Sequence, residues 1–150
     1  MDVKLPYSTT LEVRDQCLCL HLQRAARVVA RRFDDALRPV GLTNGQFSIL
    51  MSLNRPEPPR LGEVAQLLAM DRTTLTAALK PLERRDLLAL EPHETDKRAR
   101  RLRLTAAGRD VLARAMPHWR ETQVALDAEL GGAVSGDILP VLGQLGQSGK

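Results

Sequence analysis

The spacing of apolar residues changes once in the second half of this chain, and that change limits the folds that the chain can adopt. Leu88 and Leu90 alternate with other residues, as do Leu102 and Leu104, and the polar stretch 92–99 separates the two pairs. Alternation at a period of two is typical of a β-strand with one buried face. The region therefore predicts a β-hairpin, and its loop is longer than a tight turn and should project from the body.

Outside this hairpin, apolar residues recur at steps of three and four, which indicates helices. The first helix is expected from about Leu11 to Val40, closed by Gly41, and its length indicates that it packs on something besides its own chain. Thr43 and Gln46 have the spacing of a capping box at the start of the next helix. Further helices are expected over 61–69 with Val64, Leu67 and Leu68 as the apolar face, from Asp71 to Arg85, from Thr105 to about Leu130, and near the C-terminus after a capping Ser135.

The predicted order is four helices, a hairpin, a long helix and a short helix. Short helices followed by a hairpin predict a winged helix-turn-helix, and long helices at both ends are what a dimerisation layer needs. We therefore expect a mainly α fold with a small β-hairpin wing, in a single domain over 1–150. Within it, 43–105 would form the winged helix-turn-helix DNA-binding region, and 11–40 and 106–146 the dimerisation helices.

The composition is that of an ordinary globular protein, with 43% hydrophobic and 27% charged residues among 150. The charged start, Met1–Lys4, leads into no long apolar run, so we expect neither a signal peptide nor a membrane span. Two cysteines, Cys17 and Cys19, are too few and too close for a disulfide framework, which predicts a cytoplasmic protein.

The sequence contains no nucleophile motif, phosphate loop or paired carboxylates, so we do not expect an enzyme. His21, His93 and His118 lack the spacing of metal ligands, and neither a metal site nor a cofactor is expected. The formal net charge of +4 is weak support for an anionic partner, and the placement of the charges matters more.

The predicted helix from Asp71 to Arg85 separates an apolar face from a small and polar one. Leu75, Ala78, Leu79 and Leu82 share one side of a helical wheel and should lie in the core. Small and cationic residues on the other side would let the helix enter a major groove and reach base edges or phosphates. The residues expected to contact DNA from this helix are Arg72, Thr73, Thr74, Thr76, Ala77, Lys80 and Arg84. The alternative is an amphipathic helix whose polar face is only solvated.

The hairpin loop and return strand are strongly cationic from Asp96 to Arg103. A projecting cationic loop suits the narrow, electronegative minor groove, so Arg98 and Arg100 are also expected to contact DNA. Asp96 is expected to orient Arg98 by an ion pair. A solvated run of charge is the alternative, but the presence of both features on adjacent elements favours double-stranded DNA as the partner.

Four groups of residues resemble the MarR family of winged-helix regulators. The resemblance implies an obligate homodimer on a pseudo-palindromic operator, with Arg98 in the minor groove and the helix from Arg72 in the major groove. It also implies a repressor of transcription that is released by a small ligand, commonly an aromatic acid or phenol, or by oxidation. The groups are Gly41 to Phe47, Leu61 to Ala65, Asp71 to Thr76 with Leu82 to Leu87, and the wing signature of Asp96 to Arg98 with Leu102 to Gly108.

The sequence leaves two releasing signals open. His21, Phe47 and Trp119 are candidates to line a pocket for an aromatic ligand, although packing alone would also explain them. Cys19 is the candidate for a redox switch, because organic-hydroperoxide sensors of the family carry their reactive cysteine at the matching position. Those sensors activate the thiolate with tyrosines, whereas the matching residues here are Gln23, Phe33 and Asn44. The alternative for Cys19 is a small buried apolar residue.

Overall fold

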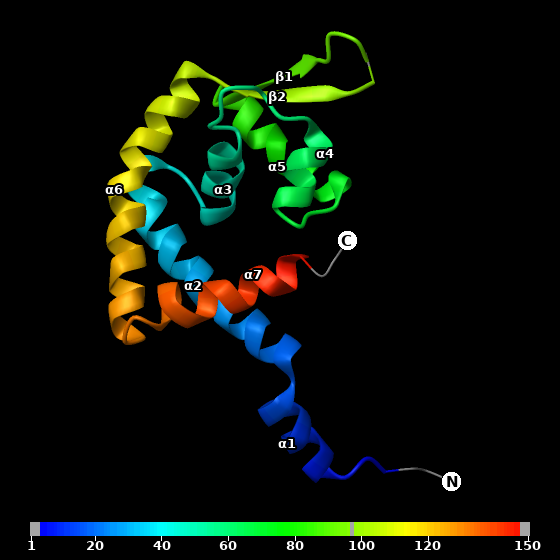
Figure 1. Cartoon of the computed structure of the whole chain (residues 1–150), viewed down its shortest axis with the longest axis vertical. Helices are drawn as coiled ribbons and strands as arrows, with labels where there is room; N and C mark the ends of the chain where they lie inside the picture. The colour runs from blue at the N-terminus through cyan, green and yellow to red at the C-terminus, as the bar shows by residue number, and fades with distance from the viewer. Residues whose placement is uncertain (1–3, 97, 148–150) are drawn as a thin grey trace.

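The computed structural model describes residues 4–96 and 98–147, which form helices and one two-stranded hairpin (Figure 1). The predicted fold class is therefore confirmed. The elements in chain order are α1 (Tyr7–Gln16), α2 (Leu18–Leu37), the 3-10 turn η1 (Arg38–Val40), α3 (Asn44–Ser52), α4 (Leu61–Leu67), α5 (Arg72–Arg84), β1 (Leu88–Pro92), β2 (Arg100–Leu104), α6 (Ala106–Glu129), the π-helical turn η2 (Val134–Ile138) and α7 (Leu139–Gln147).

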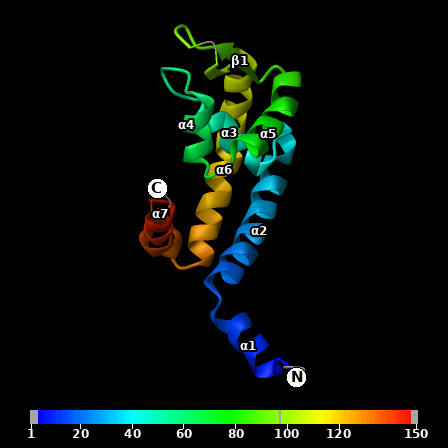
Figure 2. The same cartoon turned by 90° about the vertical axis from the view of Figure 1, so that its right-hand side faces the viewer.

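The hydrophobic core joins the three short helices and the hairpin to the two long helices. Leu75, Leu79 and Leu82 of α5 are buried in it, as predicted from the helical wheel. The end of α2 contributes Leu37, and the first half of α6 contributes a short row of side chains that starts at Val111. α2 and α6 run beside each other away from this core, and α1 continues beyond them (Figures 1 and 2).

The prediction of one uninterrupted helix from Leu11 to Val40 is wrong. Helix starts earlier, at Tyr7, and breaks at Cys17, whose backbone is extended with φ −72° and ψ 106°. The Cys17 sulfur accepts a hydrogen bond from the Leu20 amide at 3.5 Å and so caps α2. The sequence around Cys17 contains neither proline nor glycine, which is why the pattern did not predict the break.

The predicted end of this segment is partly confirmed. Gly41 has φ +72°, and its amide donates to the Arg38 carbonyl, so glycine closes the segment as expected. The α-helix itself ends earlier, at Leu37. Pro39 has no amide hydrogen to continue the α-helical bonding, and the last residues tighten into η1.

Two further details differ from the predictions. α4 ends at Leu67, and Leu67 is 66% exposed instead of lying on the buried face, because that face is formed by Leu61, Val64, Ala65 and Leu68 at helical spacing and Leu67 lies beside it. Ser135 does not cap the last helix, since it lies inside η2 and its amide donates to Asp127 at 3.2 Å. The helix starts predicted at Thr43, Asp71 and Thr105 are confirmed by their capping hydrogen bonds.

Many apolar side chains near both ends of the chain are exposed in the single chain. α1 has no buried residue, and the first half of the α2 stripe is exposed as well. The exposed large apolar residues of these regions are Leu5, Tyr7, Val13, Leu18, Val28, Val29, Val124, Leu130, Ile138, Leu139, Val141, Leu142 and Leu145.

The start of α6 packs directly against the start of the hairpin. The strands pair antiparallel, with Leu88 opposite Leu104 and Leu90 opposite Leu102. Gly108, in the first turn of α6, lies so close to the chain before β1 that a Cβ at this position would be 2.1 Å from the Leu87 carbonyl oxygen. Only glycine fits this contact without a backbone shift.

We expect Gly108→Ala to destabilise the protein by about 1–3 kcal/mol or more, because overpacking against a backbone atom cannot be relieved by a side-chain rotation. Denaturant unfolding of the two proteins, compared at equal slopes, measures the difference. Gly136→Ala is the matched control, since a Cβ there meets nothing within 4 Å. Equal unfolding midpoints for Gly108→Ala and the wild type would contradict the close contact.

Candidate nucleic-acid interface

One side of α5 is buried and the other is exposed along its whole length. Thr73, Thr76, Ala77, Lys80 and Arg84 are all exposed, whereas the leucines opposite them are buried. The polar face predicted from the sequence is thus present on the surface. Pro81 lies inside the helix without ending it.

Hydrogen bonds within the first turns of α5 hold three of its polar groups. Asp71 accepts from the Thr74 hydroxyl at 2.6 Å and from the Thr74 amide at 2.8 Å. These two bonds, the hydroxyl first, lower the pKa of Asp71. The Thr76 hydroxyl donates to the Arg72 carbonyl at 2.7 Å, so its remaining capacity is to accept a hydrogen bond and to present its methyl group.

The Arg72 side chain extends from the first turn of α5 across α4. A Cβ built on Gly62 would lie 2.9 Å from Nη2 of Arg72, so the guanidinium occupies the space left by the missing side chain. This close approach places the Arg72 guanidinium beside α4, and it was not predicted from the sequence.

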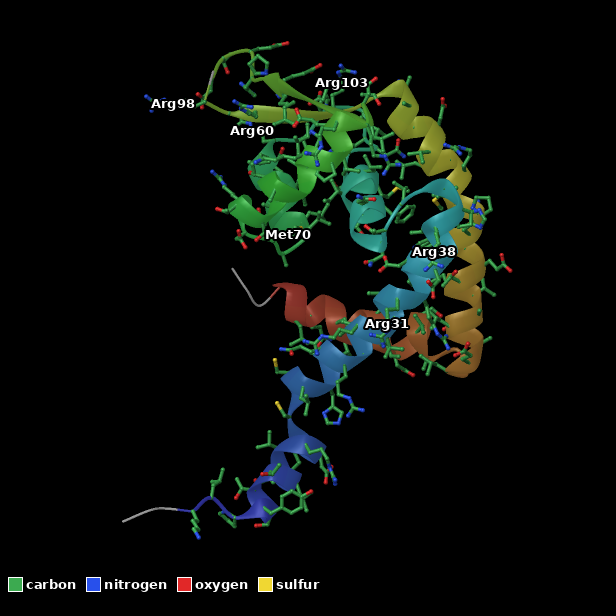
Figure 3. All side chains as sticks on the ribbon, turned by 180° about the vertical axis from the view of Figure 1, so that it is seen from behind. Arg31, Arg38, Arg60, Met70, Arg98 and Arg103 are labelled. Atoms are coloured by element: carbon green, nitrogen blue, oxygen red, sulfur yellow. The ribbon has the colours of Figure 1, made fainter. Side chains whose placement is uncertain are left out.

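The wing is closed by its own backbone. The His93 amide donates to the Ala99 carbonyl at 2.9 Å, and Asp96 accepts the Arg98 amide at 3.0 Å. The expected ion pair between Asp96 and Arg98 is therefore replaced by a bond to the Arg98 backbone, and the exposed Arg98 side chain points away from the body (Figure 3). Lys97, at the centre of the loop, lies outside the described residues.

Two contacts attach the return strand to the chain in front of α4. The Leu102 amide donates to the Pro59 carbonyl at 2.9 Å, and Arg60 forms an antiparallel bridge with Arg101. A third arginine of the strand, Arg103, is held by an ion pair with Glu91 on β1. The return strand β2 is therefore attached to β1 on one edge and to the chain before α4 on the other.

An open hollow of 880 Å³ lies between the start of α5, α4 and the wing. It brings together four of the predicted DNA-contacting residues, Arg72, Thr76, Arg98 and Arg100. Arg60 also lines it and was missed, because its place beside the wing depends on the bridge to Arg101 and no local pattern marks it. Lys80 and Arg84 lie farther along α5, at a separate shallow hollow with Glu83.

Two contacts connect α3 to α2 and the end of α5 to the segment between η1 and α3. Asn44, at the start of α3, donates to Oδ1 of Asp34 on α2 from its backbone amide at 2.7 Å and from its side chain at 2.9 Å. These bonds, the backbone one first, lower the pKa of Asp34. Arg85, which follows α5, donates to the Gly41 carbonyl at 2.9 Å.

The predicted ligand residues do not form one group. Phe47 stacks on Trp119 with ring centroids 6.4 Å apart, and both belong to the core. His21 lies at a different, surface hollow with Leu126 and Leu130. These leucines follow Trp119 by seven and eleven residues on α6, which at about 1.5 Å per residue is roughly 10–16 Å.

The two cysteines lie on either side of the start of α2. Cys19 is exposed, not buried as the packing alternative required, and its sulfur accepts from the Gln23 side chain at 3.1 Å. Cys17 is partly buried in the capping position.

Among the described residues, no three or more His, Cys, Asp or Glu side chains are grouped so that they would hold a metal ion. Over the same part of the chain, no helix has both the length and the apolar character needed to cross a membrane.

Comparison of the sequence with protein families gives one match. A profile of the MarR family matches residues 42–99, from the start of α3 to the end of the wing loop. The HTH-type transcriptional regulator SarZ of Staphylococcus epidermidis is 27% identical over 94 residues, which are 63% of this chain and 64% of SarZ. The match thus spans less than two thirds of this curated relative.

Solved structures match over most of both chains. The transcriptional regulator MosR of M. tuberculosis, in complex with DNA, is 36% identical with a TM-score of 0.80, over 89% of this chain and 96% of MosR. The transcriptional repressor CouR, bound to a 23-mer DNA duplex, is 29% identical with a TM-score of 0.79, over 95% of this chain and 98% of CouR. Bound to p-coumaroyl-CoA, CouR matches with 28% identity and a TM-score of 0.75, over 96% of this chain and 97% of CouR. The profile match and the fold, shared along nearly the whole length of MosR, show that this chain belongs to the MarR family.

Proposed function

We propose that this chain is a sequence-specific regulator of transcription that binds double-stranded DNA. The observation that carries the proposal is the hollow in which Arg72 and Thr76 of α5 face Arg98 and Arg100 of the wing. A helix in the major groove and a cationic loop in the adjacent minor groove would contact neighbouring parts of one duplex. The DNA complexes of MosR and CouR support this assignment.

The proposed contacts divide between bases and backbone. Small and polar side chains in the middle of α5 would reach base edges, since the helix can approach closely there. Arginines at its ends would contact phosphates, and the wing would enter the minor groove. The proposed DNA-contacting residues are Arg72, Thr73, Thr74, Thr76, Ala77, Lys80 and Arg84 on α5, with Arg98 and Arg100 on the wing.

We propose that the functional unit is a homodimer formed by the helices of 11–40 and 106–146, with 43–105 as the DNA-binding region. The exposed apolar side chains of a single chain gather in these helices, including Leu18, Val124 and Leu142. Apolar surface of this extent is typical of a partner interface. A two-fold dimer would present two wings and two α5 helices to a pseudo-palindromic operator.

The first prediction for this function concerns the wing. Arg98→Ala should weaken binding to a duplex selected by the wild-type protein from a random-sequence library by about 1–3 kcal/mol, because a minor-groove contact is lost. Fluorescence anisotropy at fixed salt measures the affinity. Arg120→Ala, an exposed arginine on α6, is the control and should leave binding unchanged. Unchanged affinity for Arg98→Ala would argue against the docking of the wing.

Gly62→Ala tests the position of Arg72. The added methyl group displaces only the flexible end of Arg72, so the thermal midpoint should stay the same or rise, as alanine favours helix by up to about 1 kcal/mol over glycine. Affinity for the selected duplex should fall roughly threefold to tenfold, because Arg72 no longer approaches the DNA from α4. Gly45→Ala is the control, since its nearest atom would be 4.0 Å away. Equal affinity of Gly62→Ala and wild type would show that the placement of Arg72 is unimportant.

We propose that the regulator is a repressor and that a small aromatic or phenolic molecule releases it from DNA. The surface hollow of His21 has an apolar lining from Val28, Val29 and Leu126, where such a molecule would bind between the long helices. Phe47 and Trp119 would respond to the ligand indirectly. Trp119 lies on α6 together with Leu126 of the hollow, and it stacks on Phe47. The complex of CouR with p-coumaroyl-CoA supports a small-molecule effector.

A second candidate signal is oxidation of Cys19. The observation in its favour is the exposure of this thiol together with the Gln23 amide, which donates to the sulfur at 3.1 Å. Exposure leaves the sulfur accessible to a peroxide.

Treatment of the DNA-bound protein separates the two signals. We expect a panel of aromatic acids to release the selected duplex and cumene hydroperoxide to leave it bound, since no cation lies in contact with Cys19 among the described hydrogen bonds and ion pairs. Cys19→Ser and Cys17→Ser are the paired variants. Release of the wild type by hydroperoxide, abolished in Cys19→Ser and kept in Cys17→Ser, would establish the redox signal instead.

A further inference from the structure

A buried histidine lies at the base of the wing. His93 directly follows β1 and is 9% exposed. Its Nε2 lies 3.2 Å from Nη2 of Arg60 and 3.2 Å from Nη2 of Arg101. Its Nδ1 lies 3.1 Å from the Thr95 hydroxyl, 3.2 Å from the Thr95 amide and 3.3 Å from the Asp96 amide. One ring therefore contacts the residue before α4, the return strand and the wing loop.

The chemistry of these neighbours decides between the two neutral forms of the ring. Guanidinium and amide nitrogens only donate hydrogen bonds, and the Thr95 hydroxyl is the one of these neighbours that also accepts. With its hydrogen on Nε2, the ring would accept the Thr95 and Asp96 amides at Nδ1 but would turn an N–H toward the two arginines. With its hydrogen on Nδ1, the ring donates to the Thr95 hydroxyl, and Nε2 accepts from both guanidiniums. Hydrogen bonds from charged donors are the stronger ones, so the second arrangement is favoured.

Both arginines depend on this acceptor. Nε of Arg101 is buried without a hydrogen-bond partner in the part of the chain that the structure describes. No ion pair found among those residues includes Arg60 or Arg101. Without Nε2, two guanidiniums would face each other beside the antiparallel bridge that joins their backbones. Like charges without a shared acceptor repel, so the strand would move away from α4.

We propose that His93 is a positioning residue for the wing. By accepting from Arg60 and Arg101 together, it holds β2 against the start of α4. Arg60 borders the same hollow as Arg72 and Arg98, so this contact sets where the wing stands relative to α5. The inference rests on the proposed DNA-binding function only in its consequence for the groove contacts, because the attachment of the wing is a property of the free protein.

Two substitutions distinguish the roles of Nε2 and Nδ1. The side chain of His93→Gln reaches the Nε2 position and keeps an acceptor for the arginines, whereas His93→Asn reaches only the Nδ1 position. Hydrogen exchange of the free, full-length protein should show faster exchange of β1 and β2 in His93→Asn, with α6 unchanged and His93→Gln close to wild type. If His93→Asn fails to fold, Arg60→Leu removes one of the two guanidinium donors and should speed exchange in the same strands.

The second arm uses the duplex that the wild-type protein selects from a random-sequence library. His93→Asn should bind about tenfold more weakly and lose hydroxyl-radical protection of the minor groove under the wing. It should keep protection of guanine N7 in the major groove under α5. His93→Gln should bind within about twofold of the wild type and keep both protections.

Wild-type exchange and footprint in His93→Asn would overturn the proposal. Loss of both in His93→Gln, to the same degree as in His93→Asn, would also overturn it, because the ring would then act by packing and not through Nε2. Failure of the wild type to select any duplex would refute the proposed DNA-binding function, and the exchange measurement would still decide whether His93 holds the wing.

Discussion

The arrangement of the molecule depends on the corner where Thr105 meets the chain before β1. The Thr105 amide donates to the Leu87 carbonyl at 3.2 Å, and its hydroxyl donates to the Asp86 carbonyl at 2.6 Å while accepting from Gly108 at 2.9 Å. At this corner, the first turn of α6 meets the residues just after α5 and the strand ends that lie away from the wing loop. Gly108 has no side chain, so the first turn of α6 can lie directly against Leu87. This contact, together with the Thr105 hydrogen bonds, fixes the orientation of α6 relative to α5 and the wing.

What the sequence predicted well is local. Thr43, Asp71 and Thr105 cap their helices through bonds that span three residues, so the pattern of residue types contains the whole interaction. The break at Cys17 was missed because no proline or glycine marks it and the cap is formed by a cysteine, which is not among the usual capping residues. The exposure of Leu67 was missed because the residue is adjacent to Leu68 in sequence but lies beside the covered face of Leu61, Val64 and Leu68.

The candidate site was predicted in composition more than in geometry. The face of α5 and the cationic wing follow from residue type and spacing, and the structure places both on the surface. The pairing of charged and polar side chains around the wing does not follow from residue type and spacing. Arg60 and His93 are separated by 33 positions, and only the folded chain brings them together. Asp96 was expected to bind the guanidinium of Arg98, yet its oxygen binds the backbone amide, because a bond two residues along the chain needs less ordering than an exposed ion pair.

The contact between Arg72 and Gly62 has an energetic consequence for any ligand that Arg72 meets. A free arginine side chain carries about 2 kcal/mol of rotamer entropy, and a surface arginine normally gives up much of it when a partner arrives. Here the guanidinium lies against Gly62 of α4 in the free chain. An arginine that keeps this position when a partner arrives loses less entropy on association, and it favours partners whose acceptors lie where it already points.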